Sequence, residues 1–419
     1  MRVKHVFSLL LCALAVPLTF VAQEVSSPRS NEQQVDQQLP ILQPEQLRQI
    51  PESEIRNVLS THFEIGNESA TKGLATTTPL PAFGYSDGSS GTTFTGTIVG
   101  SFPTNAVTTN VQTIVVPVVL NITQGGNTWT FNPLATDPGC LGGANTGFNL
   151  TLQSPFFNNT PVAWVINGVN EGNTQFLDAF QRAEFATIVS PANHLLLNSG
   201  VGPQLTISVA NPTGAAFGFG GQCGTNPFPV NQAGVLGVVD INTVNPILQN
   251  YITANGFNTS QFVLFVLYNA VMSNGAPTST LSNCCILGFH SVLGTGQTYG
   301  IADFDGRHGT LFTGVSDASL MAHEVGEWAN DPFLNNATPA WGNTGQVSGC
   351  QANLEVGDPL SGTLIGQVIT MPNGFTYHFQ ELAFFSWFLR DNPSLGAGGR
   401  YSSNGTLVRP SQPCPPGGR

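Results

Sequence analysis

Alternating apolar and polar positions mark residues 92–131 as a strand-forming region. Stretches 93–99 and 111–119 within it are rich in Thr, Val and Ile and alternate in polarity. Because successive side chains of a strand point to opposite faces, this period of two indicates β-structure. Two further runs of the same kind, 204–209 and 235–239, predict additional strands.

Other segments follow the helical period or are apolar throughout. Segment 174–186 spaces its apolar residues three and four apart, which predicts a helix, and 246–254 is also expected to be helical. The apolar segment 262–268 predicts a buried strand, and 299–304 predicts another that leads toward the next helix. Since strands and helices mix without a strict repeat, we expect a mixed α/β (α+β) fold.

These patterns divide the chain into four parts. We expect a signal peptide at 1–23, a polar spacer or propeptide-like segment at 24–75, a mixed α/β domain with a β-rich N-terminal part at 76–395, and a Pro- and Gly-rich tail at 396–419. The first part has basic residues followed by an apolar run, as secretory signal peptides do. The protein is therefore predicted to be secreted and extracellular. Later apolar runs are far shorter than the roughly 18 residues that a membrane span requires, so no membrane span is expected.

Composition and charge narrow the class of partner. Removal of the signal peptide takes away the basic Arg2 and Lys4 and no acidic residue, which moves the formal charge from −12 to −14. An acidic chain repels nucleic acid, which is therefore not expected as a partner. Only 9% of residues are charged, against about 25% in average soluble domains. Uncharged polar residues supply the remaining polarity, which is typical of a secreted, strand- and loop-rich protein.

Cysteine usage agrees with export. Six cysteines follow the signal peptide, and an even number in an exported chain suggests up to three disulfides: Cys140, Cys223, Cys284, Cys285, Cys350 and Cys414. No CxxC spacing favours a cysteine metal site. A bond between the neighbours Cys284 and Cys285 would close a strained eight-membered ring, so we expect them to have different partners.

The segment from Ser316 to Pro332 carries the strongest candidate chemistry. Ser316 or Asp317 is expected to cap a helix, and Pro332 disfavours helical geometry at the residue before it. His323 and Glu327 are four residues apart and therefore one helical turn apart. An imidazole nitrogen and a carboxylate oxygen so placed can reach one ion, as the two histidines of an HExxH helix reach zinc.

Glu324 occupies the position at which HExxH metallopeptidases keep their general base, beside the metal and its bound water. A carboxylate there takes the proton of the water and later passes it to the leaving amine. The alternative interpretation is that His323, Glu324 and Glu327 form an ordinary polar helix face.

A third protein ligand must come from elsewhere in the chain. Asp331 lies about 12 Å from His323 along an ideal helix, so it is expected to be a helix-end residue. Glu355 and Asp358 are better candidates, because their segment can fold back onto the helix. We rank Glu355 first as ligand, while one carboxylate of the pair could instead orient His323. His378 is the next candidate.

The motif residues form an ordered series: His323, Glu324, Glu327, Asp331, Pro332, Trp341, Glu355 and Asp358. The series resembles the HExxE…DP…W…ExxD pattern of secreted zinc-metallopeptidase-like (zincin-like) proteins related to the plant Exordium (phosphate-induced) family. The resemblance implies a zincin-like core, export, and a metal held by the residues matching His323, Glu327 and either Glu355 or Asp358. One departure is that Cys350 precedes Glu355, whereas in the plant proteins a cysteine closely follows the matching aspartate.

Two functional hypotheses follow. The first is a secreted metal-dependent peptidase-like hydrolase, a zinc metalloprotease, that acts on a peptide or protein with a metal-bound water activated by Glu324. Zn²⁺ is the expected cofactor, and Mn²⁺ or Ca²⁺ stay open because oxygen ligands suit harder ions. The alternative is a non-catalytic extracellular or wall-associated protein with a structural metal site. The chain contains neither a GxSxG nucleophile motif nor a P-loop.

Overall fold

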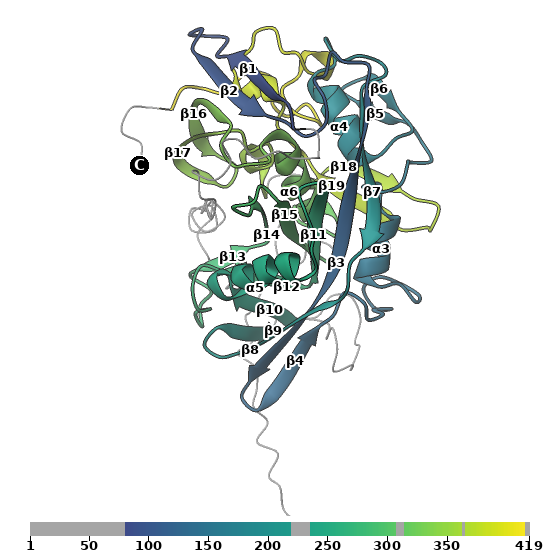
Figure 1. Ribbon diagram of the computed structural model, residues 1–419, viewed down its shortest axis with the longest axis vertical. Helices are drawn as coiled ribbons and strands as arrows, with labels where there is room; N and C mark the ends of the chain where they lie inside the picture. The colour runs from purple at the N-terminus through teal and green to yellow at the C-terminus, as the bar shows by residue number, and fades with distance from the viewer. Residues whose placement is uncertain (1–79, 219–234, 307–313, 363–364, 415–419) are drawn as a thin grey trace, which may run out of the picture. The chain divides into compact units, whose positions relative to one another are not determined.

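The computed structural model describes residues 80–218, 235–306, 314–362 and 365–414. The expected signal peptide (1–23) and spacer (24–75) lie outside these ranges, as do residues 76–79 of the expected mixed domain and Cys223. Strands predominate over helices, in agreement with the predicted mixed α/β (α+β) class (Figure 1). No helix within the described ranges combines the length and the apolarity needed to cross a bilayer.

The long strand β3 (Thr108–Gln124) organises the main sheet. Its first half pairs in parallel with β11 (Gln261–Tyr268) on one side and β7 (His194–Val201) on the other. Its second half pairs antiparallel with β4 (Asn127–Phe131) and parallel with β8 (Leu205–Ala210). One continuous strand of 17 residues therefore connects both halves of the sheet.

The sheet extends from β11 toward the candidate site. β15 (Thr298–Phe304) pairs in parallel with β11, and β14 (Gly288–Val292) pairs antiparallel with β15 at the edge. A second sheet has the strand order β13-β12-β10-β9, with these bounds: β9 (Gly214–Gly218), β10 (Val235–Asp240), β12 (Ala270–Ser273) and β13 (Cys284–Ile286).

Hairpins and helices complete the described fold. The paired strands outside the two larger sheets are β1 (Ala82–Ser86) with β2 (Thr93–Thr97), β5 (Trp164–Ile166) with β6 (Val169–Gly172), β16 (Ala337–Thr344) with β17 (Val347–Asn353), and β18 (Ile365–Thr370) with β19 (Thr376–Gln380). The helices are α3 (Gly147–Gln153), α4 (Phe176–Glu184), α5 (Ile241–Ala254), α6 (Ser319–Asn330), α7 (Phe385–Phe388) and the short 3₁₀ turns η1 (Asp358–Leu360) and η2 (Ala397–Gly399). Every segment for which the sequence predicts a strand or a helix contains the expected element.

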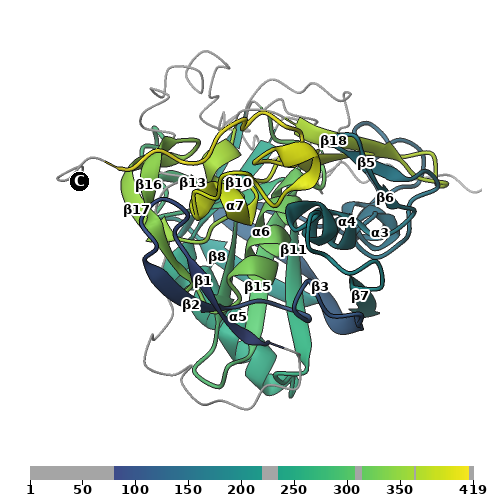
Figure 2. The same ribbon diagram turned by 90° about the horizontal axis from the view of Figure 1, so that it is seen from above.

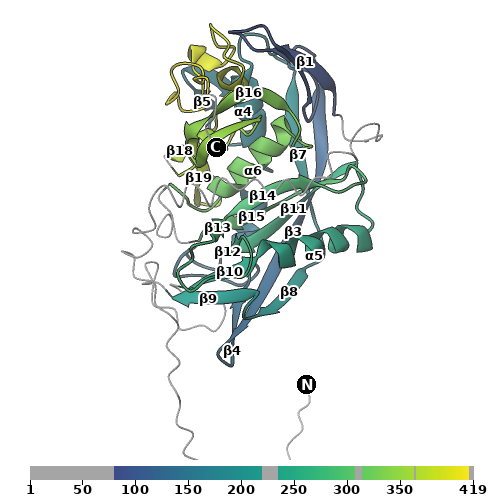
Figure 3. The same cartoon turned by 90° about the vertical axis from the view of Figure 1, so that its left-hand side faces the viewer.

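Both faces of the main sheet are covered, which explains why β11 is apolar along its whole length. Phe262 and Leu264 belong to the hydrophobic core that also contains the apolar residues of α6. Val263 and Phe265 belong to the core that contains the apolar face of α5. Since neighbouring residues of a strand point to opposite faces, α6 and α5 lie on opposite sides of the sheet, as Figure 3 shows.

The start of α6 differs from the expected cap. The residue before the helix is Ala318, which makes no side-chain cap hydrogen bond, and the helix begins at Ser319. The carboxylate of Asp317 instead accepts hydrogen bonds from the backbone N–H of Ala318 at 2.6 Å and from the backbone N–H of His378 at 2.8 Å. The predicted capping by Ser316 or Asp317 is therefore wrong, because the Asp317 carboxylate accepts a hydrogen bond from a neighbouring strand instead.

The disulfides correct one expectation and link the expected C-terminal tail to the mixed domain. Cys284 and Cys285 are bonded to each other, and the peptide bond between them is cis, with their Cα atoms 3.0 Å apart. The prediction that they have different partners is therefore wrong, and the eight-membered ring is formed. Cys350 is bonded to Cys414, and Cys140 is also disulfide-bonded. The bond at Cys414 ties the described part of the expected tail to β17.

Candidate metal centre

Helix α6 is enclosed by protein on all sides. Its twelve residues are all buried. Trp328 stacks on Phe262 of β11 with ring centroids 3.9 Å apart, and its indole N–H donates to Thr298 Oγ1 at 3.0 Å. Figure 2 shows α6 running over β15, against which it packs. The face that carries His323 and Glu327 is therefore not an ordinary solvated helix face, and buried polar groups there need partners.

The first cluster joins His323, Glu327 and Asp358. The Nε2 atom of His323 lies 3.1 Å from Glu327 Oε1 and 3.5 Å from Asp358 Oδ1. One ligand atom from each of the three residues lies within 4.8 Å of the others, and all three residues are buried. The helical spacing brings the first two together, and η1 supplies the third.

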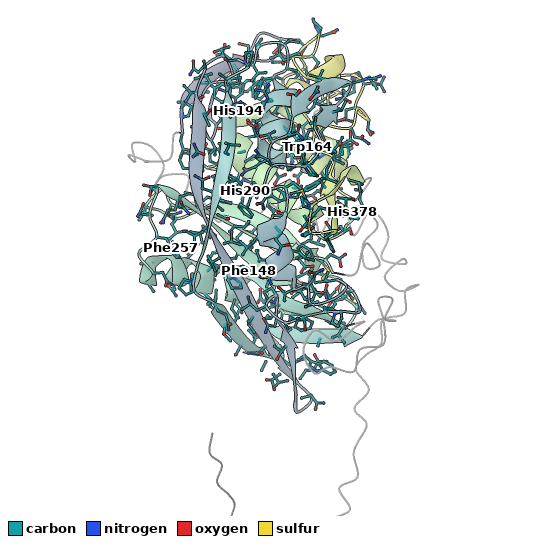
Figure 4. All side chains as sticks on the ribbon, turned by 90° about the vertical axis from the view of Figure 1, so that its right-hand side faces the viewer. Phe148, Trp164, His194, Phe257, His290 and His378 are labelled. Carbon is teal, nitrogen blue, oxygen red and sulfur yellow. A yellow bond between two sulfur atoms is a disulfide. The ribbon has the colours of Figure 1, made fainter. Side chains whose placement is uncertain are left out.

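A second cluster lies beside the first and shares one of its members. His290 of β14, Glu327 and Glu355 also place ligand atoms within 4.8 Å of one another. The Nδ1 atom of His290 lies 3.6 Å from Glu327 Oε2 and 3.7 Å from Glu324 Oε2. Figure 4 shows His290 among packed side chains, and the residue is only 4% exposed.

Polar groups around the first cluster hold its side chains in place. The Nδ1 atom of His323 lies 3.2 Å from Gln380 Oε1 and 3.3 Å from Ser361 Oγ. The side-chain amide of Gln351 donates to Asp358 Oδ2 at 2.9 Å, and that of Gln346 donates to Asp358 Oδ1. Such outer contacts fix the orientation of a metal ligand.

Two glycines allow the close approach of backbone to these side chains. A Cβ atom on Gly357 would lie 2.4 Å from His323 Nδ1 and 2.5 Å from its Cγ. A Cβ atom on Gly288 of β14 would lie 2.8 Å from both Cγ and Oε1 of Glu324. The backbone N–H of Gly357 also donates to Glu327 Oε1 at 3.1 Å. Any larger residue at either position would displace a motif side chain.

The charges of the cluster act strongly on one another. Burial lowers the pKa of His323, but the attraction of Glu327 and a hydrogen bond with Asp358 outweigh it, so the pKa lies well above its usual value of 6.5. For His290, burial again opposes protonation, while contacts with Glu324 and Glu327 raise its pKa well above 6.5. Burial raises the pKa of Glu324. Burial also favours a higher pKa for Glu327, but its neighbours His323 and His290 outweigh burial and lower the pKa overall.

The structure separates the two candidates for the third ligand. Asp358 joins His323 and Glu327, whereas Glu355 joins Glu327 and His290. For an ion bound by His323, this geometry favours Asp358 over Glu355, the opposite of the predicted ranking. The next candidate, His378, lies elsewhere, with its Nδ1 atom 2.6 Å from Asp317 Oδ2.

One helix-end prediction is confirmed and one site residue was missed. Asp331 caps the C-terminus of α6 and accepts the backbone N–H groups of Asn335 and Asn336 at 2.9 and 3.0 Å. His290 was not identified from the sequence, because it lies in a strand without any motif. Its only signal is that it is one of seven histidines in the chain.

The donor set fits a divalent cation. An imidazole nitrogen with carboxylate oxygens is a combination found in sites for zinc and for harder first-row ions. Comparison of the chain with protein-family models, with curated proteins and with solved structures gave no match. The resemblance to the Exordium pattern therefore stays a prediction that depends on the motif residues alone.

Proposed function

We propose that the protein is a secreted, metal-dependent peptidase-like hydrolase with a zincin-like core. His323, Glu327 and Asp358 would hold the ion, and Glu324 would act as general base. The observation that carries this proposal is the convergence of the first three side chains within 4.8 Å, on the same buried helix that presents Glu324.

The small remaining exposure of the cluster supports this division of roles. The side chains of His323 and Glu324 are 9% and 8% exposed, whereas those of Glu327 and Asp358 are 3% and 1% exposed. His323 and Glu324 are thus the least enclosed members of a buried group. The hydrolase proposal requires a water molecule and a substrate carbonyl to approach from the side of His323 and Glu324.

The proposed chemistry assigns one task to each side chain. A bound divalent ion supplies Lewis acidity and lowers the pKa of water toward about 7. The carboxylate of Glu324 would take the proton from the attacking water and pass it to the leaving amine. Gln380 and Ser361, at Nδ1 of His323, would keep the imidazole oriented.

The nature of the ligands bears on the metal and on the rate. We propose Zn²⁺ as the cofactor, with Mn²⁺ or Ca²⁺ as alternatives because carboxylate-rich ligation suits harder ions. The anionic Glu327, at the position of the second histidine of HExxH, makes a bound ion less electrophilic. Peptide cleavage should therefore be slower than in an HExxH enzyme and should shift toward alkaline pH.

Deep burial favours a second candidate function. His290 and Glu355 are 4% and 1% exposed, and Asp358 is fully buried. An ion so enclosed would hold α6, β14 and the segment after β17 together and would not need to contact a substrate. The second candidate is thus a non-catalytic extracellular or wall-associated protein with a structural metal site.

The deciding experiment compares the wild-type protein with Glu324→Gln on an unbiased peptide library, with metal content measured in both. The hydrolase proposal expects the variant to keep its metal and lose cleavage. Glu171→Gln is a matched control, because Glu171 pairs with Arg182 at 3.4 Å and not with the cluster. If the wild type binds metal but cleaves nothing from acidic to alkaline pH with Zn²⁺, Mn²⁺ or Ca²⁺, the structural candidate replaces the hydrolase.

A further inference from the structure

The shared glutamate is the feature that extends the site beyond one ion. Its two carboxylate oxygens face different histidines: Oε1 lies 3.1 Å from His323 Nε2, and Oε2 lies 3.6 Å from His290 Nδ1. Each of these two histidines belongs with Glu327 to a separate cluster of three ligand residues, completed by Asp358 for His323 and by Glu355 for His290.

We propose that Glu327 bridges two divalent cations, one bound by His323 and Asp358 and the other by His290 and Glu355. The inference rests on the metal site of the proposed function and adds a second ion to it. A bridging carboxylate is suited to metal pairs about 3.5–4 Å apart, a separation that recurs in two-metal hydrolytic sites.

Independent elements supply the ligands of the second position. His290 comes from the edge strand β14, and Glu355 follows β17, so neither is a sequence neighbour of α6. Asn353 donates its side-chain amide to Glu355 Oε1 at 3.1 Å, and the backbone carbonyl of Asp331 lies 3.1 Å from His290 Nε2. The second contact keeps Nδ1 of His290 as the ring nitrogen that faces the carboxylates. Both ligands are therefore oriented by outer partners, as metal ligands usually are.

The carboxylates around His290 also favour a cation there. Glu327 and Glu324 place carboxylate oxygens 3.6 and 3.7 Å from His290 Nδ1, and Glu355 places a ligand atom within 4.8 Å of those of His290 and Glu327. A divalent ion between them would be shared by the imidazole nitrogen and these carboxylate oxygens. One nitrogen with several oxygens is a ligand set suited to Mn²⁺ or Zn²⁺.

The test is metal stoichiometry of the full-length secreted protein, with Mn²⁺ as the probe. Calorimetric titration and elemental analysis should give two equivalents for the wild type. Electron paramagnetic resonance should show a spin-coupled manganese pair. His290→Gln and Glu355→Gln should each bind one equivalent and give an uncoupled signal. His194→Gln is the matched control, since His194 pairs with Asp178 at 2.9 Å, and it should keep both ions.

The outcomes separate the second ion from the proposed function. If the wild type binds one equivalent that His323→Gln removes and His290→Gln leaves intact, the bridged pair is refuted while the single-ion site stands. If the wild type binds none, both proposals fail. Circular dichroism of each variant confirms folding, and Glu355→Gln tests the second position without altering β14.

Discussion

Gly357→Ala should weaken metal binding without removing any ligand. The new methyl group would lie 2.4 Å from His323 Nδ1 and 2.7 Å from its Cε1. The backbone at this position cannot easily retreat, because its N–H donates to Glu327 and its carbonyl accepts from Gln380 at 2.6 Å. To reach an ordinary contact distance, the imidazole must therefore move by about 1 Å.

That displacement exceeds the tolerance of a metal site, where ligand distances vary by about 0.2 Å. We expect affinity to fall about 10- to 100-fold, which corresponds to about 1.4–2.8 kcal/mol. The assay is titration with Zn²⁺ or Mn²⁺ against a competing chelator. Gly84→Ala is the control, because its methyl group would meet only Phe94 O at 3.8 Å. Wild-type affinity in Gly357→Ala would refute the placement of His323 against this glycine.

Three further predictions concern stability and ligand choice. Burial raises the pKa of Glu184 from 4.5 to about 8. The folded state then holds a proton that the unfolded state has lost, so stability should fall as pH rises from about 4.5 to about 8, by at most roughly 5 kcal/mol. Urea unfolding across this range should show the slope in the wild type and not in Glu184→Gln. Replacing both Cys350 and Cys414, 64 residues apart, by Ser should cost roughly 4 kcal/mol; unchanged unfolding would show that the bond does not constrain the chain. Asp358→Asn should reduce affinity at the His323 position more than Glu355→Gln does, and the reverse order would restore the ranking from sequence.

Periodicity in the sequence predicted the strands and helices because burial follows the local repeat. The apolar run 262–268 became β11, buried on both faces by the two cores. The same logic identified His323 and Glu327, since a ligand pair one turn apart is a local property of the helix. Features that depend only on nearby residues in the sequence could therefore be predicted.

The remaining parts of the site depend on tertiary contacts that no local pattern records. His290 reaches Glu327 only because β14 pairs at the sheet edge beside α6. Whether Glu355 or Asp358 lies beside His323 depends on how the chain turns after β17. Asp317 was expected to cap α6. Its carboxylate instead contacts both the backbone N–H and the imidazole Nδ1 of His378, a residue of β19.

The most direct test of the proposed metal centre is an anomalous difference map from crystals of the purified protein, recorded at the absorption edge of the metal found by elemental analysis. We predict a peak bounded by His323 Nε2, Glu327 Oε1 and an Asp358 oxygen. A well-ordered α6 with no anomalous density among these three residues, in crystals supplied with Zn²⁺ or Mn²⁺, would contradict it.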